Sequence, residues 1–171
     1  MRVIRFLTLL LLLSLILSLS AQEENVHRTP PPPLNDAYTA WMIGEWKGET
    51  SSQMGKSTDY MKCELGLNGQ FMIITFESKT EDGLSISGLG AVTLDKEGNT
   101  VGYWIDSWRI MSEGKGFREG NLSTIKWATP MGTYIRTTEK IDENTMKVTG
   151  VMTGANVQEM RSETEFKRII K

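Results

Sequence analysis

The sequence predicts an all-β protein, an up-and-down antiparallel barrel of about ten strands behind a short N-terminal helix. From residue 44 onward, short runs alternate apolar and polar side chains, which is the period of a strand with one buried face. Turn residues separate these runs, and no helical stretch between them is long enough for the crossover that parallel strands need. Antiparallel strands joined by tight turns protect their edges by closing into a barrel.

The first 21 residues have the pattern of a secretory signal peptide. Arg2 and Arg5 form a basic start, residues 6–19 are an almost unbroken Leu/Ile run, and small residues end the segment at Ala21. The alternative is an uncleaved anchor, which needs about 20 apolar residues to cross a bilayer comfortably. The pattern therefore predicts cleavage, no stable membrane insertion afterwards, and a periplasmic or secreted protein. Loss of Arg2 and Arg5 would change the net charge from −2 to −4.

Residues 22–33 form a Pro-rich linker that contains four consecutive prolines, Pro30–Pro33. Such a run favours an extended polyproline II spacer, and a passive N-terminal tail is the alternative. The sole histidine of the chain, His27, lies in this linker. Residues 34–171 remain for the barrel, enough for one domain, because single domains typically have about 100–150 residues.

The folded part is expected to begin with a short helix from Asp36 to Met42, capped by Asn35. Gly44 ends this helix and opens the first strand. The apolar face of the helix would consist of Leu34, Tyr38, Trp41 and Met42.

In the strands that follow, alternate side chains share a face. Met61 and Cys63 oppose Tyr60 and Lys62, and the buried face places Cys63 in the core as a small apolar residue. Asn-Gly and Asp-Gly suit two-residue hairpins because both central residues can take a positive φ. Glycines at 88 and 90 are expected to break a strand where the barrel wall would need to bend sharply. The expected corners are 68–69, 82–83, 97–99, 130–132, 142–144 and 154–156.

Composition and motifs exclude several common functions. With its only histidine in the linker, the domain can form no Ser-His-Asp or Cys-His couple. A single Cys forms no internal disulfide, and neither a Cys pair nor a His-Glu-x-x-His motif offers a zinc site, so no metal is predicted. No basic stripe indicates nucleic acid. Gly88-Leu89-Gly90 lacks the third glycine and the following helix of a nucleotide loop, and no cofactor is predicted.

The densest group of candidate binding residues is Trp104-Ile105-Asp106-Ser107-Trp108. In a strand, Trp104, Asp106 and Trp108 would project to one face, so that two indoles flank a carboxylate in a cavity. The alternative is that both indoles pack the core while Asp106 caps a turn or pairs with an arginine. Tyr103 joins this group. A neighbouring strand adds Tyr134 and Arg136 as polar contacts, and Arg136 could hold a carboxylate bidentately if it points inward.

Five short motifs follow one another along the chain: Gly44-Glu45-Trp46-Lys47-Gly48, Leu67-Asn68-Gly69-Gln70-Phe71, Ser87-Gly88-Leu89-Gly90, Tyr103-Trp104-Ile105-Asp106-Ser107 and Phe166-Lys167-Arg168. Their order resembles the bacterial DUF1579 family, domains of unknown function, across nearly all of the mature chain. The resemblance implies a calycin-like barrel, akin to lipocalins, fatty-acid-binding proteins and nitrobindins, and it implies no catalytic residues. Nitrobindin-like barrels bind haem through a histidine on a late strand, and this chain has no histidine after position 27.

In lipocalin-like barrels, a tryptophan on the first strand often packs under an arginine from the last. Here Trp46 and Arg168 are placed to make this contact and to close the end of the barrel, with Arg161 as the alternative arginine. A cation–π contact of this kind stabilises a fold by about 0.5–2 kcal/mol.

Three functions remain open at the level of sequence. The first is an exported barrel that binds a small apolar or amphipathic molecule without catalysis, and the nine methionines after the initiator suit such a cavity. The second is a structural or interaction module of the cell envelope, whose barrel is filled by its own side chains and holds no cavity of about 300 Å³ or more. The third is a carboxylate-based enzyme, which would need a carboxyl with a strongly raised pKa in a cleft. The oligomeric state is not predicted.

Overall fold

The computed structural model describes residues 30–53, 55–155 and 157–170. It divides the chain into two units, Met1–Pro32 and Pro33–Lys171. Of the first unit, Pro30–Pro32 are described, and they are exposed and lie outside any helix or strand. The expected signal peptide and His27 lie outside the described residues. Within the described part, no helix combines the length and the apolar character needed to cross a bilayer.

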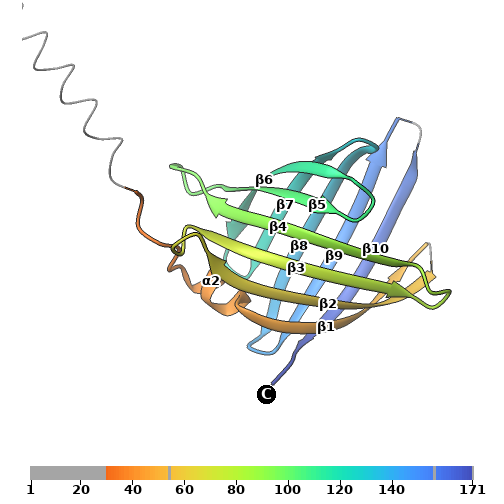
Figure 1. Ribbon diagram of the computed structural model, residues 1–171, viewed down its shortest axis with the longest axis horizontal. Coiled ribbons are helices and arrows are strands. Elements are labelled where there is room, and N and C mark those ends of the chain that lie inside the picture. Colours follow the sequence, from red (N-terminus) through yellow and green to blue (C-terminus); the bar gives the residue numbers. More distant parts are fainter. Residues whose placement is uncertain (1–29, 54, 156, 171) are drawn as a thin grey trace, which may run out of the picture. The chain divides into compact units, whose positions relative to one another are not determined.

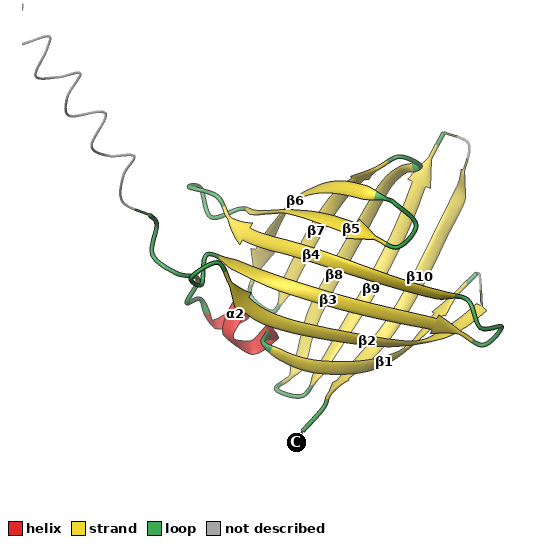
Figure 2. Ribbon diagram, in the orientation of Figure 1, coloured by secondary structure: helices red, strands yellow, loops and turns green. Residues whose placement is uncertain are grey.

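The second unit is a closed antiparallel barrel of ten strands, which confirms the predicted fold class (Figures 1 and 2). Each strand pairs with its neighbours in the sequence, and β1 also pairs with β10 to close the sheet. The strands are β1 (Gly44–Ser52), β2 (Gly55–Gly66), β3 (Phe71–Thr80), β4 (Ser85–Leu94), β5 (Thr100–Asp106), β6 (Met111–Glu119), β7 (Leu122–Thr129), β8 (Gly132–Asp142), β9 (Thr145–Gly154) and β10 (Val157–Arg168).

The short helix α2 (Ala37–Met42) precedes β1 and lies at one end of the barrel (Figure 2). The expected cap at Asn35 is wrong by one residue. Asp36 is the N-cap, because its carboxylate accepts from the backbone N–H of Thr39 at 2.8 Å and from the Thr39 hydroxyl at 2.7 Å. The same carboxylate forms an ion pair with Arg118 at 2.8 Å, so the cap also ties the helix to β6.

All six expected corners fall on turns, but some turns are longer than predicted, such as the one expected at 97–99, which spans residues 95–99. Instead of two-residue hairpins at 68–69 and 82–83, the strands are joined by residues 67–70 and 81–84. The first turn is long because Leu67, Asn68 and Gly69 all take positive φ, with values of 51°, 58° and 78°. Three further turns, between β1 and β2, β5 and β6, and β6 and β7, are not among the predicted corners.

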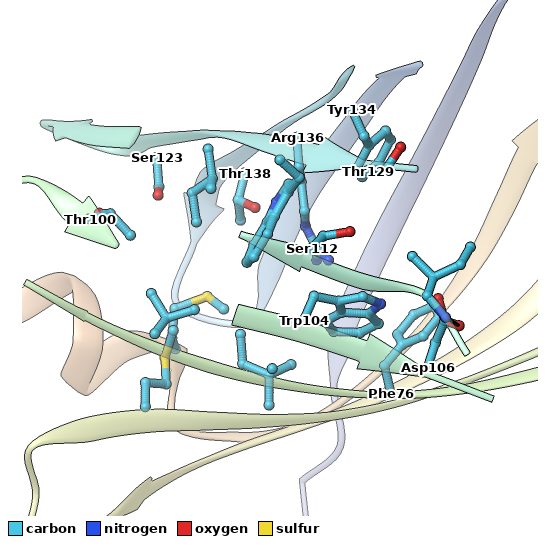
Figure 3. A pocket seen from close by; sticks show the side chains of 18 of the residues that line it. Phe76, Thr100, Trp104, Asp106, Ser112, Ser123, Thr129, Tyr134, Arg136 and Thr138 are labelled. Atoms are coloured by element: carbon cyan, nitrogen blue, oxygen red, sulfur yellow. Dashed lines mark hydrogen bonds between the residues drawn. The ribbon is translucent and has the colours of Figure 1, made fainter. Parts of the chain in front are cut away.

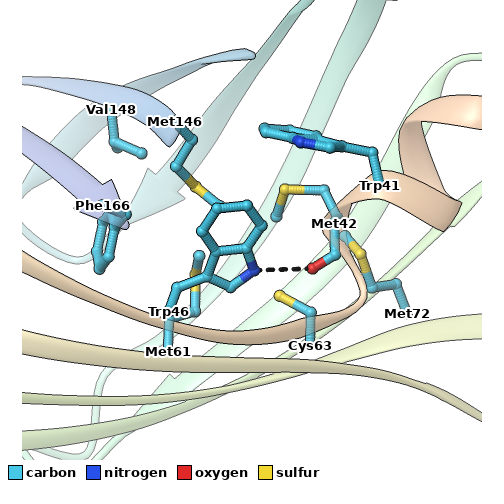
Figure 4. Close-up of a cluster of buried hydrophobic side chains, with 9 residues drawn as sticks. All are labelled: Trp41, Met42, Trp46, Met61, Cys63, Met72, Met146, Val148 and Phe166. Atoms are coloured by element: carbon cyan, nitrogen blue, oxygen red, sulfur yellow. Dashed lines mark hydrogen bonds between the residues drawn. The ribbon is translucent and has the colours of Figure 1, made fainter. Parts of the chain in front are cut away.

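The hydrophobic core fills the helix end of the barrel (Figure 4). Trp46 is fully buried, contacts Trp41 edge-to-face, and donates from its indole N–H to the carbonyl of Met42 at 3.0 Å. Cys63 is buried as predicted, and burial raises the pKa of its thiol to about 12. The core cluster consists of Trp41, Met42, Trp46, Met61, Cys63, Met72, Met146, Val148 and Phe166.

Arg168 lies over the indole of Trp46, with its guanidinium carbon 4.1 Å from the ring centroid. The guanidinium also donates to the carbonyls of Trp41 at 2.5 Å, Ile43 at 2.7 Å and Glu143 at 3.2 Å. This is the contact that the sequence analysis expects of Arg168. The alternative arginine, Arg161, is exposed and pairs with its neighbour Glu159 instead. Arg168 therefore joins the end of β10 to the helix and to the turn between β8 and β9.

Candidate functional site

The interior of the barrel holds a cavity of about 260 Å³ that begins at α2 and runs to the opposite end of the strands (Figure 3). Its wall is formed by α2 and by β3 to β9, with the turns that follow β5 and β7. The apolar lining is Met42, Met72, Ile74, Phe76, Gly90, Val92, Trp104, Ile110, Ile125, Trp127, Met131 and Met152. The polar lining is Tyr38, Thr100, Asp106, Ser112, Arg118, Ser123, Thr129, Tyr134, Arg136 and Thr138.

The cavity exists because glycines replace side chains on the inner face of several strands. Gly114 of β6 pairs with Trp127 of β7, and a Cβ at position 114 would lie 2.5 Å from the Trp127 ring. In the same way, Trp104 lies against Gly88 and Gly90 of β4. The prediction that these two glycines break a strand is wrong, because β4 runs unbroken through both. Their role is to accept the indole against the wall, which leaves the middle of the barrel open.

Trp104 and Asp106 line the cavity, as expected from their shared face of β5. Trp104 packs edge-to-face on Phe76, with ring centroids 6.1 Å apart. The Asp106 carboxylate accepts from the backbone N–H groups of Trp108 at 2.9 Å and Ile110 at 3.2 Å. Asp106 thus caps the turn that follows β5, which is the alternative that the sequence left open, and it does so at the cavity's edge.

Trp108 and Tyr103 do not line the cavity, and their expected placement there is wrong. Strand β5 ends at Asp106, so the two-residue alternation does not carry on to Trp108, whose turn position leaves it 48% exposed. Tyr103 lies on the outer face, opposite Ala91 and Glu113, and is 58% exposed. One indole, and not two, therefore accompanies Asp106.

Tyr134 and Arg136 come from the inner face of β8 and line the cavity, as the sequence analysis expects. The Tyr134 hydroxyl end lies close to Gly150 of β9, where a Cβ would collide with it. Arg136 extends across the interior to β2, where its guanidinium donates to the Met61 sulfur at 3.6 Å. Four of the six predicted binding residues therefore line one cavity: Trp104, Asp106, Tyr134 and Arg136.

Sequence reasoning missed the polar group near the helix. Arg118 of β6 pairs with Asp36, donates to the Thr39 hydroxyl at 2.9 Å, and lies over the Tyr38 ring at 4.8 Å. Burial raises the pKa of Tyr38, an effect opposed by hydrogen bonds with Ser123 and Thr138 and by the charges of Arg118 and Arg136. The alternation of Gly114, Gly116 and Arg118 along β6 is the signal that could have identified Arg118 as inward-facing.

A second hollow of about 270 Å³ lies along β1 to β3. It is lined by outward-facing Tyr60, Lys62 and Glu77 together with Ile169, so it is a groove on the outer surface with charged walls. Within the described residues, no group of three or more His, Cys, Asp and Glu side chains is arranged to hold a metal ion. The interior cavity is therefore the candidate site.

No family model matches the chain, and no curated protein sequence matches it. Among solved structures, the S-type phycobiliprotein lyase CPES from Guillardia theta has a TM-score of 0.61 at 8% identity, over 78% of this chain and 92% of that one. Rv2717c from M. tuberculosis has a TM-score of 0.60 at 13% identity, over 80% and 99% of the two chains. EF1p2_mFAP2b bound to DFHBI has a TM-score of 0.51 at 12% identity, over 77% and 97%. At these identities the likeness shows the fold alone.

Proposed function

We propose that this protein binds a small amphipathic molecule inside its barrel and has no catalytic activity. The observation that carries the proposal is the mixed chemistry of the cavity wall. Strands β3 and β4 contribute apolar side chains, such as Met72, Ile74 and Val92, whereas β6 to β8 contribute hydroxyls and two arginines. Ligand sites are typically apolar hollows with a few placed polar groups, and this wall has that composition.

The rival function is a structural module with a filled barrel. The volume of about 260 Å³ lies just below the range of about 300–1,000 Å³ that is usual for ligand sites. The volume thus meets the condition set for the filled barrel, but it lies so close to the limit that the chemistry of the wall has to separate the two functions. A self-filled interior would be expected to carry apolar side chains at positions 112, 123 and 136, because polar groups are costly to bury without partners. The residues present are Ser112, Ser123 and Arg136.

A carboxylate-based enzyme has no observation in its favour. Asp106, the acidic residue in the lining, is engaged with the backbone of its own turn. The described carboxyl groups whose pKa departs from the ordinary value are Asp36, Asp82, Asp95 and Asp142, and each is lowered. A catalytic acid of the expected kind would have a raised pKa.

Binding of a small neutral fluorescent probe, 1-naphthylamine, tests the proposed function. Ser112 is buried and lines the cavity, so Ser112→Phe would place a ring in the hollow and should abolish probe binding. The matched control is Glu113→Phe, since Glu113 is the next residue and faces outward. Equal probe binding by the wild type and by both variants, with the fold retained in circular dichroism, would contradict binding inside the barrel.

We also propose that the protein is exported and that it belongs to the DUF1579 family. The basic start, the apolar run and the small residues of the first 21 positions support secretion to the periplasm or beyond, as a soluble carrier after signal cleavage. N-terminal sequencing of the protein from a cell-envelope fraction would test this by locating the mature start. The order of the five short motifs supports membership of the DUF1579 family. The DFHBI-bound barrel, which has the same fold, supports the proposal as a precedent for a bound small molecule.

A further inference from the structure

Arg136 differs from the other arginines that touch the barrel interior. Arg118 has the carboxylate of Asp36, and Arg168 has three backbone carbonyls. Arg136 is half-buried, and within the described part of the chain its side-chain partner is the thioether of Met61 at 3.6 Å. A thioether is a weak acceptor, whereas a guanidinium has five donors suited to oxygen. A half-buried cation without an oxygen partner in the described part of the chain loses part of its hydration without compensation, so this arginine is placed to receive an anion.

Asp59 is the acidic residue nearest in sequence to Met61, which Arg136 contacts, and its carboxylate already accepts hydrogen bonds from other residues. Asp59 is buried on the same face of β2 as Met61, two residues away. One Asp59 oxygen accepts from Ser57 at 2.8 Å and Ser78 at 2.7 Å, and the other accepts from Thr50. No ion pair joins Asp59 to Arg136 among the described residues. The buried carboxylate is thus stabilised by hydroxyls, and the guanidinium is left for a guest.

The side chains around Arg136 and the volume of the cavity indicate the polarity and the size of the molecule that would bind. Thr138 lies two residues further along the same inner face of β8, and Tyr134 two residues before, so two hydroxyl-bearing side chains flank Arg136 on the cavity wall. Toward the end of the barrel away from α2, apolar side chains such as Trp104 and Trp127 share the wall with Asp106, Thr129 and Tyr134 (Figure 3). One water occupies about 30 Å³ in the liquid. A hollow of about 260 Å³ thus has room for roughly ten non-hydrogen atoms.

We propose that Arg136 binds the carboxylate of an amphipathic monocarboxylic acid of roughly ten non-hydrogen atoms, whose apolar body lies against Trp104 and Trp127. This inference rests on the proposed function and names its ligand class. The acid enters carboxylate first, from the end of the barrel opposite α2. Arg136 is the residue that selects the acid over a neutral molecule of the same shape.

The experiment compares octanoate with 1-octanol as competitors of 1-naphthylamine, a fluorescent probe small enough for the cavity, at pH 7.5. We expect the wild type to bind octanoate roughly ten- to a hundredfold more tightly than octanol, the range for hydrogen bonds to a charged group. Arg136→Met should remove this preference and leave octanol binding within twofold, while Arg136→Lys restores part of it through its charge. Lys126→Met is the matched control, because Lys126 is exposed on the outer face of β7 and its loss changes the net charge equally.

The outcomes separate the two proposals. Equal binding of octanol and octanoate by the wild type overturns the role of Arg136 and leaves the proposed function standing. Displacement by neither compound, with no probe binding by the wild type, overturns both. The wild-type comparison does not depend on any variant folding. A third competitor, octylammonium, should bind more weakly than octanol, and tighter binding of this cation would also overturn the proposal.

Discussion

Replacement of Arg168 by methionine should destabilise the barrel more than any other single loss of charge at its surface. The substitution removes a cation over the Trp46 ring at 4.1 Å and three charged hydrogen bonds to backbone carbonyls. The ring contact contributes about 2 kcal/mol when desolvated. A charged hydrogen bond contributes about 1.5–3 kcal/mol, but water can reach carbonyls at a half-buried rim. We therefore expect a combined loss of about 3–4 kcal/mol.

Urea denaturation followed by tryptophan fluorescence measures this loss. With a slope of about 2 kcal/mol per molar urea, the midpoint should fall by roughly 1.5–2 M. Arg161→Met is the control, because the Arg161 side chain is 68% exposed and forms a surface ion pair with Glu159. Exposed pairs of this kind contribute about 0–1 kcal/mol. A midpoint for Arg168→Met that matches the control would refute the closure of the barrel by Arg168.

Three further outcomes follow from the described geometry. Gly114→Ala should push Trp127 into the cavity and cost about 1–3 kcal/mol, read as weaker probe binding and a lower urea midpoint. Burial raises the pKa of Asp36, but hydrogen bonds from Thr39 and the charge of Arg118 outweigh it and leave the folded pKa below 3.8. The Asp36 carboxylate therefore stabilises the fold fully above its unfolded pKa, and this stabilisation is lost as the pH falls through the folded pKa. The urea midpoint of the wild type should decrease below about pH 4, and that of Asp36→Asn should decrease less. Cys63 should not react with Ellman's reagent at pH 8 until urea unfolds the protein, because the thiol is buried and its pKa is about 12.

The fold could be predicted because it depends on local patterns. Two-residue alternation and turn residues both act over a few positions, and they predict about ten strands and six of the nine turns without any knowledge of distant contacts. The turn at 67–70 shows where local reading stops, since three successive positive φ values are not encoded by Asn-Gly alone. The end of β5 at Asp106 is a similar case, because an aspartate can either continue a strand or cap a turn.

The site was harder to predict because it depends on what the strands leave empty. Tryptophan at 104 could be placed inward from its period, but whether it fills the barrel depends on Gly88 and Gly90 of the neighbouring strand. In the sequence, these glycines suggest an interrupted strand. In the folded sheet, they make room for the side chain of the neighbouring strand. Arg118 was missed because its role comes from Asp36, which lies 82 residues away in the chain.

The seam between β1 and β10 has a consequence for biosynthesis. Thr50 and Thr164 are hydrogen-bonded across it, although 114 residues separate them. A ribosome makes β1 first, so this strand waits with one bare edge until the last segment of the polypeptide is released. Closing so long a loop is entropically slow, and the half-built sheet is exposed to aggregation in the meantime. A chaperone that shields the edge of nascent β1 should therefore raise the yield of soluble protein, and a truncation that deletes β10 should lower it, whether or not a ligand is present.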